Sequence, residues 1–161
     1  MNRYIRSAFV VVGLLLVQTT FLPLISVEGV IPDILLIWVI YNAVRRGQIE
    51  GMVAGFVVGL LQDITTIQFF GLAALAKTVT GFAAGYFFSE NKTAVTLGSY
   101  RFVAIVAVGS LLHNLMYFGI LLQGIETSSI YSISSWSSTT MLYTVAISFL
   151  PMFAFSRKQI T

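Results

Sequence analysis

Two oppositely charged residues stand out in the stretch "GLLQDITTIQFFGLAALAKT", residues 59–78, because nearly everything around them is uncharged. An ionisable side chain in an apolar environment usually faces other helices and pairs with an opposite charge. We therefore predict that Lys77 is neutralised by Asp63, with Asp33 as the alternative acid and Gln62 as a possible helper. Such a pair either fixes the register of two helices or contacts a partner or ligand directly.

A second polar pair, His113 and Asn114, lies in the middle of another apolar run. A lone histidine can relay protons, whereas a His-Asn pair within a membrane more often forms hydrogen bonds between helices. The chain has one histidine, and the predicted helices at 102–122 and 139–155 contain no acid, so a proton relay would need groups from other helices. We therefore favour the structural role.

The sequence shows no pattern of catalytic or metal-binding residues. It has no cysteine, which excludes disulfides and thiol chemistry, and it lacks the H-E-x-x-H, G-x-S-x-G and P-loop motifs. We expect no catalytic residue, no metal site and no cofactor, and we do not expect an enzyme.

Composition places the chain in the membrane. Of its 161 residues 57% are hydrophobic and only 9% are charged, whereas about 25% are charged in a soluble domain. The surroundings of such a chain are the lipid bilayer, and the net charge of +3 does not indicate nucleic acid. In membrane proteins the positions of Lys and Arg matter more than their sum.

Hydropathy predicts an all-α protein with one membrane domain, residues 1–161, made of six transmembrane helices. A bilayer core of ~30 Å needs ~20 apolar helical residues. The predicted helices cover about residues 7–25, 31–44, 48–67, 70–88, 102–122 and 139–155. Residues 127–140 are rich in Ser and Thr, and we expect them to form a solvated outer loop.

The basic residues predict the orientation of these helices. Six crossings place eight of the nine Lys and Arg residues on one side of the membrane, namely Arg3, Arg6, Arg45, Arg46, Lys92, Arg101, Arg157 and Lys158. Since positive residues are enriched on the cytoplasmic side, both termini are predicted to be cytoplasmic.

Glycines recur every four residues on two of the predicted helices, at Gly51, Gly55 and Gly59 and again at Gly81 and Gly85. Residues four apart share a helix face, and glycine lets another backbone approach closely. The two rows pack helices within the chain or receive the transmembrane helix of a partner, and the spacing alone does not separate these alternatives.

Two segments together resemble a known family: "IPDILLIWVIYNAVRRG", residues 31–47, and "EGMVAGFVVGLLQDITTIQFFGLAALAKTVTGFAAG", residues 50–85. The shared pattern is Pro-Asp followed by aliphatic residues, a basic turn, a glycine-spaced helix, Leu-Gln-Asp, and then Gly-Leu-x-Ala-Leu-x-Lys. In this pattern the chain resembles the rod-shape-determining MreD family. Residues 90–161 carry only generic membrane features.

The resemblance implies a multi-pass protein of the bacterial inner membrane that acts in cell elongation and peptidoglycan synthesis. It implies a non-enzymatic scaffold that binds the single-pass protein MreC and associates with MreB-like, glycosyltransferase and transpeptidase components. The family is similar in architecture to the substrate-binding components of energy-coupling-factor (ECF) transporters, which implies an outward-facing cavity. The alternative function is therefore a solute-binding transport subunit.

Overall fold

The computed structural model describes residues 3–26, 31–66, 70–121 and 128–157. All the regular structure in these ranges is helical, so the prediction of an all-helical chain is confirmed there. The elements are α1 (Arg3–Leu16), a π-helical turn (Val17–Phe21), a 3-10 turn (Leu22–Ile25), α2 (Ile34–Arg46), α3 (Gln48–Thr66), α4 (Leu72–Ala84), a 3-10 turn (Gly85–Phe87), α5 (Thr93–Leu97), α6 (Tyr100–Leu121) and α7 (Ser128–Arg157).

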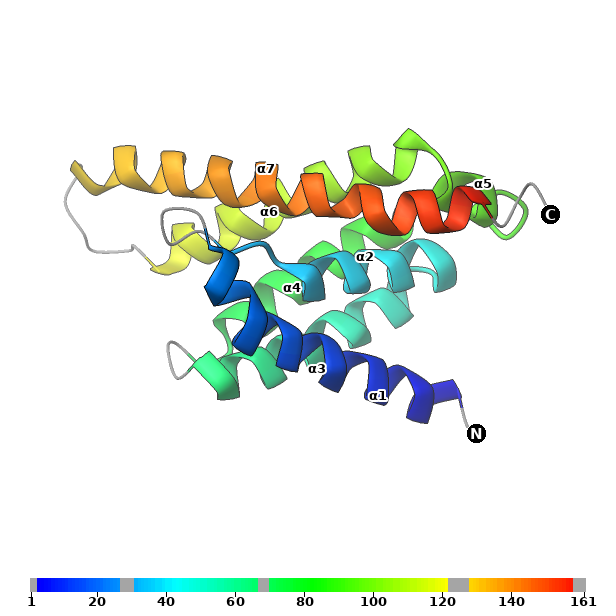
Figure 1. The fold of residues 1–161 in the computed structure, drawn as a ribbon, viewed down its shortest axis with the longest axis horizontal. Helices are drawn as coiled ribbons and strands as arrows, with labels where there is room; N and C mark the ends of the chain where they lie inside the picture. The colour runs from blue at the N-terminus through cyan, green and yellow to red at the C-terminus, as the bar shows by residue number, and fades with distance from the viewer. Residues whose placement is uncertain (1–2, 27–30, 67–69, 122–127, 158–161) are drawn as a thin grey trace.

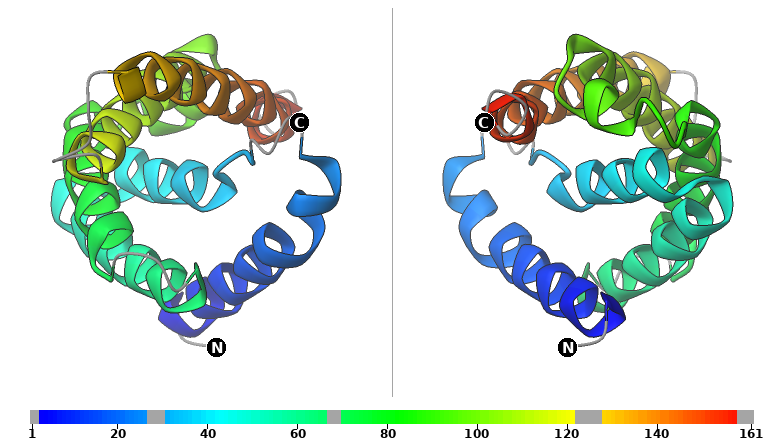
Figure 2. Two further views of the ribbon diagram at one scale, coloured as in Figure 1. Left: turned by 90° about the vertical axis from the view of Figure 1, so that its left-hand side faces the viewer. Right: turned by 90° about the vertical axis from the view of Figure 1, so that its right-hand side faces the viewer.

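The long helices run back and forth along one axis, and the two ends of the chain lie at the same end of the bundle (Figure 1). Viewed along this axis, α2 lies near the middle with α1, α3, α4, α6 and α7 around it (Figure 2). Burial agrees with this position, since Leu35, Leu36, Val39 and Ile40 of α2 are fully buried. The helix that carries Asp33 at its start is therefore the centre of the fold.

The ends of α2 follow from local sequence. The Asp33 side chain caps the N-terminus, where Oδ1 accepts a hydrogen bond from the Leu36 amide at 2.9 Å. This satisfies one of the backbone amides that a helix start leaves unpaired. The C-terminus follows Arg45 and Arg46 at Gly47, whose φ of 96° suits glycine.

Within the described ranges, three helical segments are able to span a membrane by length and apolar composition, namely Ile5–Leu24, Gln48–Thr66 and Tyr100–Ile120. A shorter apolar helical segment covers Ser138–Ala154. The helices α2 and α4 have 13 residues each, which is ~20 Å of helix against a bilayer core of ~30 Å. Each of the six predicted ranges contains a helix, but their crossing of the membrane stays a prediction.

The expected outer loop at residues 127–140 is wrong for the part described, because α7 already begins at Ser128 and extends for 30 residues. Two features favour helix there. The stretch from residue 128 to 140 contains neither Gly nor Pro, and Ile130, Ile133 and Trp136 recur at a helical spacing of three. Hydroxyl side chains are also compatible with a helix because they can bond a carbonyl one turn back, as Thr144 does to Thr140 at 2.8 Å.

Candidate functional site

Lys77 and Asp33 form a buried ion pair between α4 and the start of α2. Lys77 is fully buried, and its Nζ donates a hydrogen bond to Asp33 Oδ2. Asp33 is itself held from a third helix, since its backbone amide donates to Thr144 Oγ1 on α7 at 3.1 Å. One carboxylate therefore links the central helix to α4, while the backbone of the same residue binds α7.

His113 brings a fourth helix to this cluster. The residue lies on α6, is buried, and places Nε2 3.7 Å from Asp33 Oδ2. Its ring stacks on Tyr117 one turn along α6, with 5.9 Å between the ring centroids. The cluster therefore joins α2, α4 and α6 through side chains. The neighbouring Asn114 is also buried, so the predicted polar pair faces the bundle interior.

The prediction that Asp63 neutralises Lys77 is wrong. Asp63 instead binds the start of α4, where Oδ2 accepts from the amides of Gly71 and Ala74 at 3.0 and 3.1 Å, and Oδ1 accepts from Ala73 at 3.1 Å. The first turn of a helix has unpaired amides and the positive end of the helix dipole. The Asp63 carboxylate accepts hydrogen bonds from these amides and is stabilised by the dipole. Lys77 therefore pairs with the alternative acid, Asp33.

Gln62 does not assist the pair in the predicted way, since its Oε1 is buried and accepts no hydrogen bond from Lys77 in the described part of the chain. It lines a cavity of about 410 Å³ together with Asp33, His113 and Asn114. Other polar residues of this cavity are Gln18, Thr19, Thr65, Thr66, Tyr117 and Thr140. Gln18 Oε1 accepts from the Leu35 amide at 3.2 Å and so ties the end of the first helical segment to α2.

This polar cavity lies among the helix ends opposite the two chain ends, because α3 and α6 finish there and α2 begins there (Figure 1). Asp33 and His113 contribute to its wall, so the buried charge cluster borders the cavity. The cluster can stabilise charged side chains in the interior of the bundle. Within the described ranges, no three His, Cys, Asp or Glu side chains are placed to hold a metal ion.

The two glycine rows pack α3 against α4. A Cβ atom added at Gly51 would lie 2.6 Å from the carbonyl oxygen of Gly81, and one at Gly59 would lie 2.6 Å from that of Ala73. A Cβ at Gly55 would collide with the Lys77 carbonyl, and one at Gly85 with the backbone of Gln48. These faces are therefore occupied within the chain, and they are not open to the helix of a partner.

The glycine row also positions the buried lysine. Because Gly55 has no side chain, the α4 backbone at Lys77 can lie directly against α3. The α3–α4 contact is the most extensive between two helices of the described chain. It fixes the backbone of Lys77 on one side, while Asp33 holds its ammonium group on the other.

Comparison with known families decides the identity of the chain. The family described as rod shape-determining protein MreD matches residues 3–159 of the 161. The chain belongs to the MreD family. A role in determining rod shape and a location in a membrane follow from this membership. Comparisons with curated proteins and with solved structures found no match, so the likeness to the ECF transporter components stays a prediction.

In this MreD-family protein, Thr144 was not predicted from the sequence. It is uncharged, but its hydroxyl accepts a hydrogen bond from the backbone amide of Asp33. A signal was present, because Thr140, Thr144 and Ser148 recur every four residues within the apolar segment of α7, Ser138–Ala154. Thr144 and Ser148 are both fully buried. A row of hydroxyls on one face of an apolar helix marks a face that packs on polar groups.

Proposed function

We propose that this MreD-family protein is a non-enzymatic scaffold of the bacterial cell-elongation machinery, and that it holds an MreC-like single-pass membrane protein. Further members of the assembly would be MreB-like, glycosyltransferase and transpeptidase components. The family role in rod shape is the foundation of this proposal. The scaffold role and the partner go beyond it.

The scaffold role is supported by the contacts of the buried ionisable side chains, which bind groups of the same chain. Asp63 binds the start of α4, and Lys77, Asp33 and His113 bind one another. Each of these groups stabilises the contact between helices of the same chain. A protein that uses its ionisable groups in this way acts through the shape and the surface of its bundle.

The outer surface of the bundle is apolar along α3. Ile49, Val53, Phe56 and Ile64 are each at least half exposed, and their spacing of four, three and eight places them on one side of the helix. In a bilayer such a surface contacts lipid or the helix of a partner. Association with a single-pass protein needs a surface of this kind and needs no catalytic group.

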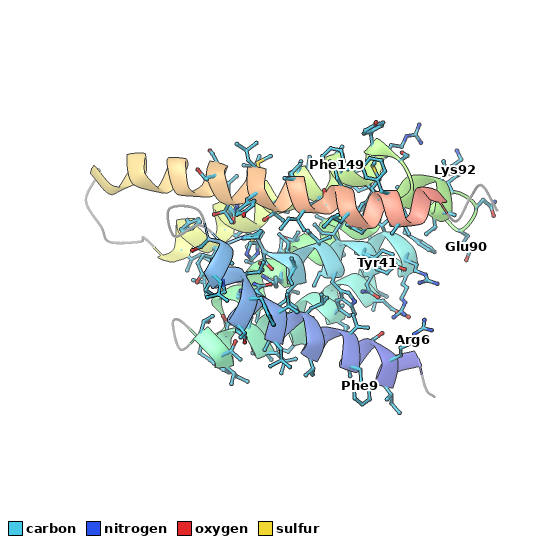
Figure 3. All side chains as sticks on the ribbon, in the orientation of Figure 1. Arg6, Phe9, Tyr41, Glu90, Lys92 and Phe149 are labelled. Atoms are coloured by element: carbon cyan, nitrogen blue, oxygen red, sulfur yellow. The ribbon has the colours of Figure 1, made fainter. Side chains whose placement is uncertain are left out.

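We further propose that the chain crosses the bacterial inner membrane six times, as a single domain, with both termini in the cytoplasm. The end of α2, which carries Arg45 and Arg46, and the beginning of α6, which carries Arg101, lie at the end of the bundle that carries the two chain ends (Figure 1). Lys92 lies at the same end (Figure 3). Enrichment of basic residues on the cytoplasmic side supports this orientation.

Cysteine labelling tests the orientation without background, because the chain has no cysteine. We expect Ser128→Cys, at the start of α7, to react with a membrane-impermeant thiol reagent added to spheroplasts. Ser156→Cys, near the other end of α7, should react only after the membrane is opened. Labelling of Ser156→Cys from outside would exclude the proposed orientation.

Affinity purification from the native membrane in a mild detergent, followed by mass spectrometry, tests the scaffold role. We expect a single-pass MreC-like protein in stoichiometric amounts. A variant with Phe56→Arg on the exposed face of α3 and a matched variant with Val108→Arg on the exposed face of α6 show whether either surface is needed. Recovery of an ATPase pair without a single-pass protein would support a transport subunit and contradict the scaffold.

A further inference from the structure

A second cavity lies between α1, α2 and α7, near the end of the bundle that carries the chain ends, and its volume is about 470 Å³. Its walls are mainly aliphatic, and Val10, Leu14, Ile37 and Leu150 are among them. We call it the α1–α2–α7 groove. It is open on one side because α1 contacts the remainder of the described chain only sparsely and is mostly exposed.

Three arginines line the same groove: Arg6 from α1, and Arg45 and Arg46 from the last turn of α2. Arg46 is paired with Glu50, with 3.2 Å between its Nη1 and the carboxylate. Neither Arg6 nor Arg45 has an acidic partner among the described residues. The groove thus combines an apolar wall with two positive charges that no acid among the described residues neutralises.

Arg45 is held in place by a neutral side chain, that of Tyr41. Its Nη1 donates to the Tyr41 hydroxyl at 2.7 Å, and its guanidinium carbon lies 5.8 Å from the centre of the Tyr41 ring. Tyr41 and Arg6 both lie in the half of the molecule that carries the chain ends (Figure 3). An arginine fixed in this way keeps donors that match the oxygens of a phosphate group.

We propose that the α1–α2–α7 groove binds one anionic phospholipid. Arg6 and Arg45 bind its phosphate, and one acyl chain lies along the wall formed by Val10, Ile37 and Leu150. Basic pockets between transmembrane helices on the cytoplasmic side are typical sites for anionic headgroups. The apolar wall adds the contact that a free anion does not make.

The size of the groove favours a lipid over the helix of another protein. A transmembrane helix ~30 Å long and ~10 Å across occupies on the order of 2,400 Å³, about five times the volume of the groove. The groove therefore cannot enclose a helix, which would lie mostly outside it. A single acyl chain is thin enough to lie inside, and its phosphate would then meet the arginines.

Native mass spectrometry of the full-length protein in a mild detergent tests this proposal. The probes are phosphatidylglycerol, which is anionic, phosphatidylethanolamine, which is zwitterionic, and glycerol phosphate, which has the anion without acyl chains. The test variant combines Arg6→Gln with Arg45→Gln. Its matched control combines Lys92→Gln with Arg101→Gln, which removes the same charge from the same end but outside the groove.

A second pair of variants tests the apolar wall and leaves every arginine in place. Val10→Trp fills the groove, whereas Leu16→Trp adds the same ring at an exposed position of α1 that does not line it. The thermal transition of each variant, measured without added lipid, shows whether the fold is kept. If the double arginine variant fails to fold, Val10→Trp still decides the question.

We expect phosphatidylglycerol to bind in preference to phosphatidylethanolamine, and glycerol phosphate not to compete. Loss of each arginine should weaken binding about tenfold, as expected for a charge-assisted hydrogen bond. Val10→Trp should also weaken it, and both controls should keep it. Equal binding of the two lipids, competition by glycerol phosphate, or a loss in the controls that equals the loss in the test variants would overturn the proposal.

Discussion

The buried pair of Lys77 and Asp33 makes a quantitative prediction about the free energy of unfolding. Lys77 is 0% exposed, and the Asp33 side chain is 11% exposed. Removing one partner leaves the other charge without compensation, which destabilises a protein by about 3–5 kcal/mol. We therefore expect Lys77→Met and Asp33→Asn each to lower the free energy of unfolding by about this amount. Asn is chosen because it caps a helix about as well as Asp.

The double variant separates the ion pair from the two side chains themselves. Replacing a whole buried ion pair with neutral groups is often close to neutral, so Lys77→Met with Asp33→Asn should lose no more than either single variant. The coupling free energy of the cycle would then be at least about 3 kcal/mol, at the upper end of values for residues in contact. Reversible unfolding in detergent, followed by tryptophan fluorescence, measures all four proteins.

A second cycle with Lys77→Met and Asp63→Asn is the control. Asp63 binds the amides at the start of α4 and makes no ion pair with Lys77 in the described structure, so its coupling to Lys77 should be much smaller. Additive losses in the first cycle, or a larger coupling in the second, would show that Lys77 is neutralised by an acid other than Asp33.

Three further predictions concern the contacts around this pair. Asp63→Ala removes the acceptor of three backbone amides and should lower the free energy of unfolding by about 2 kcal/mol, whereas Asp63→Asn should lose less; unfolding curves compare them. Gly59→Leu should abolish folded protein on size-exclusion chromatography because α4 lies against it, while Gly119→Leu should elute as the parent does because a Cβ added there meets no other atom. Thr144→Val keeps the shape but leaves the Asp33 amide unpaired, and should destabilise by about 1–3 kcal/mol in the same unfolding assay.

Much of the fold follows from the sequence because long apolar runs have few options in lipid. Each predicted range contains a helix, and the predicted range 31–44 agrees with α2, Ile34–Arg46, to within a few residues at each end. Local chemistry sets these features, and a sequence records local chemistry directly. The short helix α5 was not predicted, since five residues between apolar runs carry no periodic signal.

The partner of Lys77 was harder to predict, because it depends on which helix start lies beside α4. The sequence places Asp63 and Lys77 on consecutive predicted helices and so favours their pairing, although Asp63 lies beside the first turn of α4 and Lys77 lies further along that helix. Asp33 is 44 residues away in the chain. Only the position of α2 in the middle of the bundle brings its N-cap residue to α4 (Figure 2).

The contacts of the glycine rows also depend on how the helices are arranged, which the sequence does not record. A spacing of four predicts a close approach of two backbones, and the structure has that approach between α3 and α4. The spacing does not say whether the second backbone belongs to the same chain. That depends on the antiparallel arrangement of the whole bundle, in which Gly51 meets Gly81 while Gly59 meets Ala73 and Ala74.

Lys77 explains why so apolar a chain keeps a buried charge. Its backbone lies against Gly55 of α3, and its side chain reaches Asp33 at the start of α2, so one residue belongs to two helix contacts at once. A leucine at this position would still pack, but it would leave the Asp33 carboxylate unpaired beside His113. An apolar contact tolerates sliding of one helix past another, whereas a buried ion pair loses several kcal/mol when its partners separate. We therefore expect the pair to select one register of α2 and α4 from those that apolar packing alone would allow.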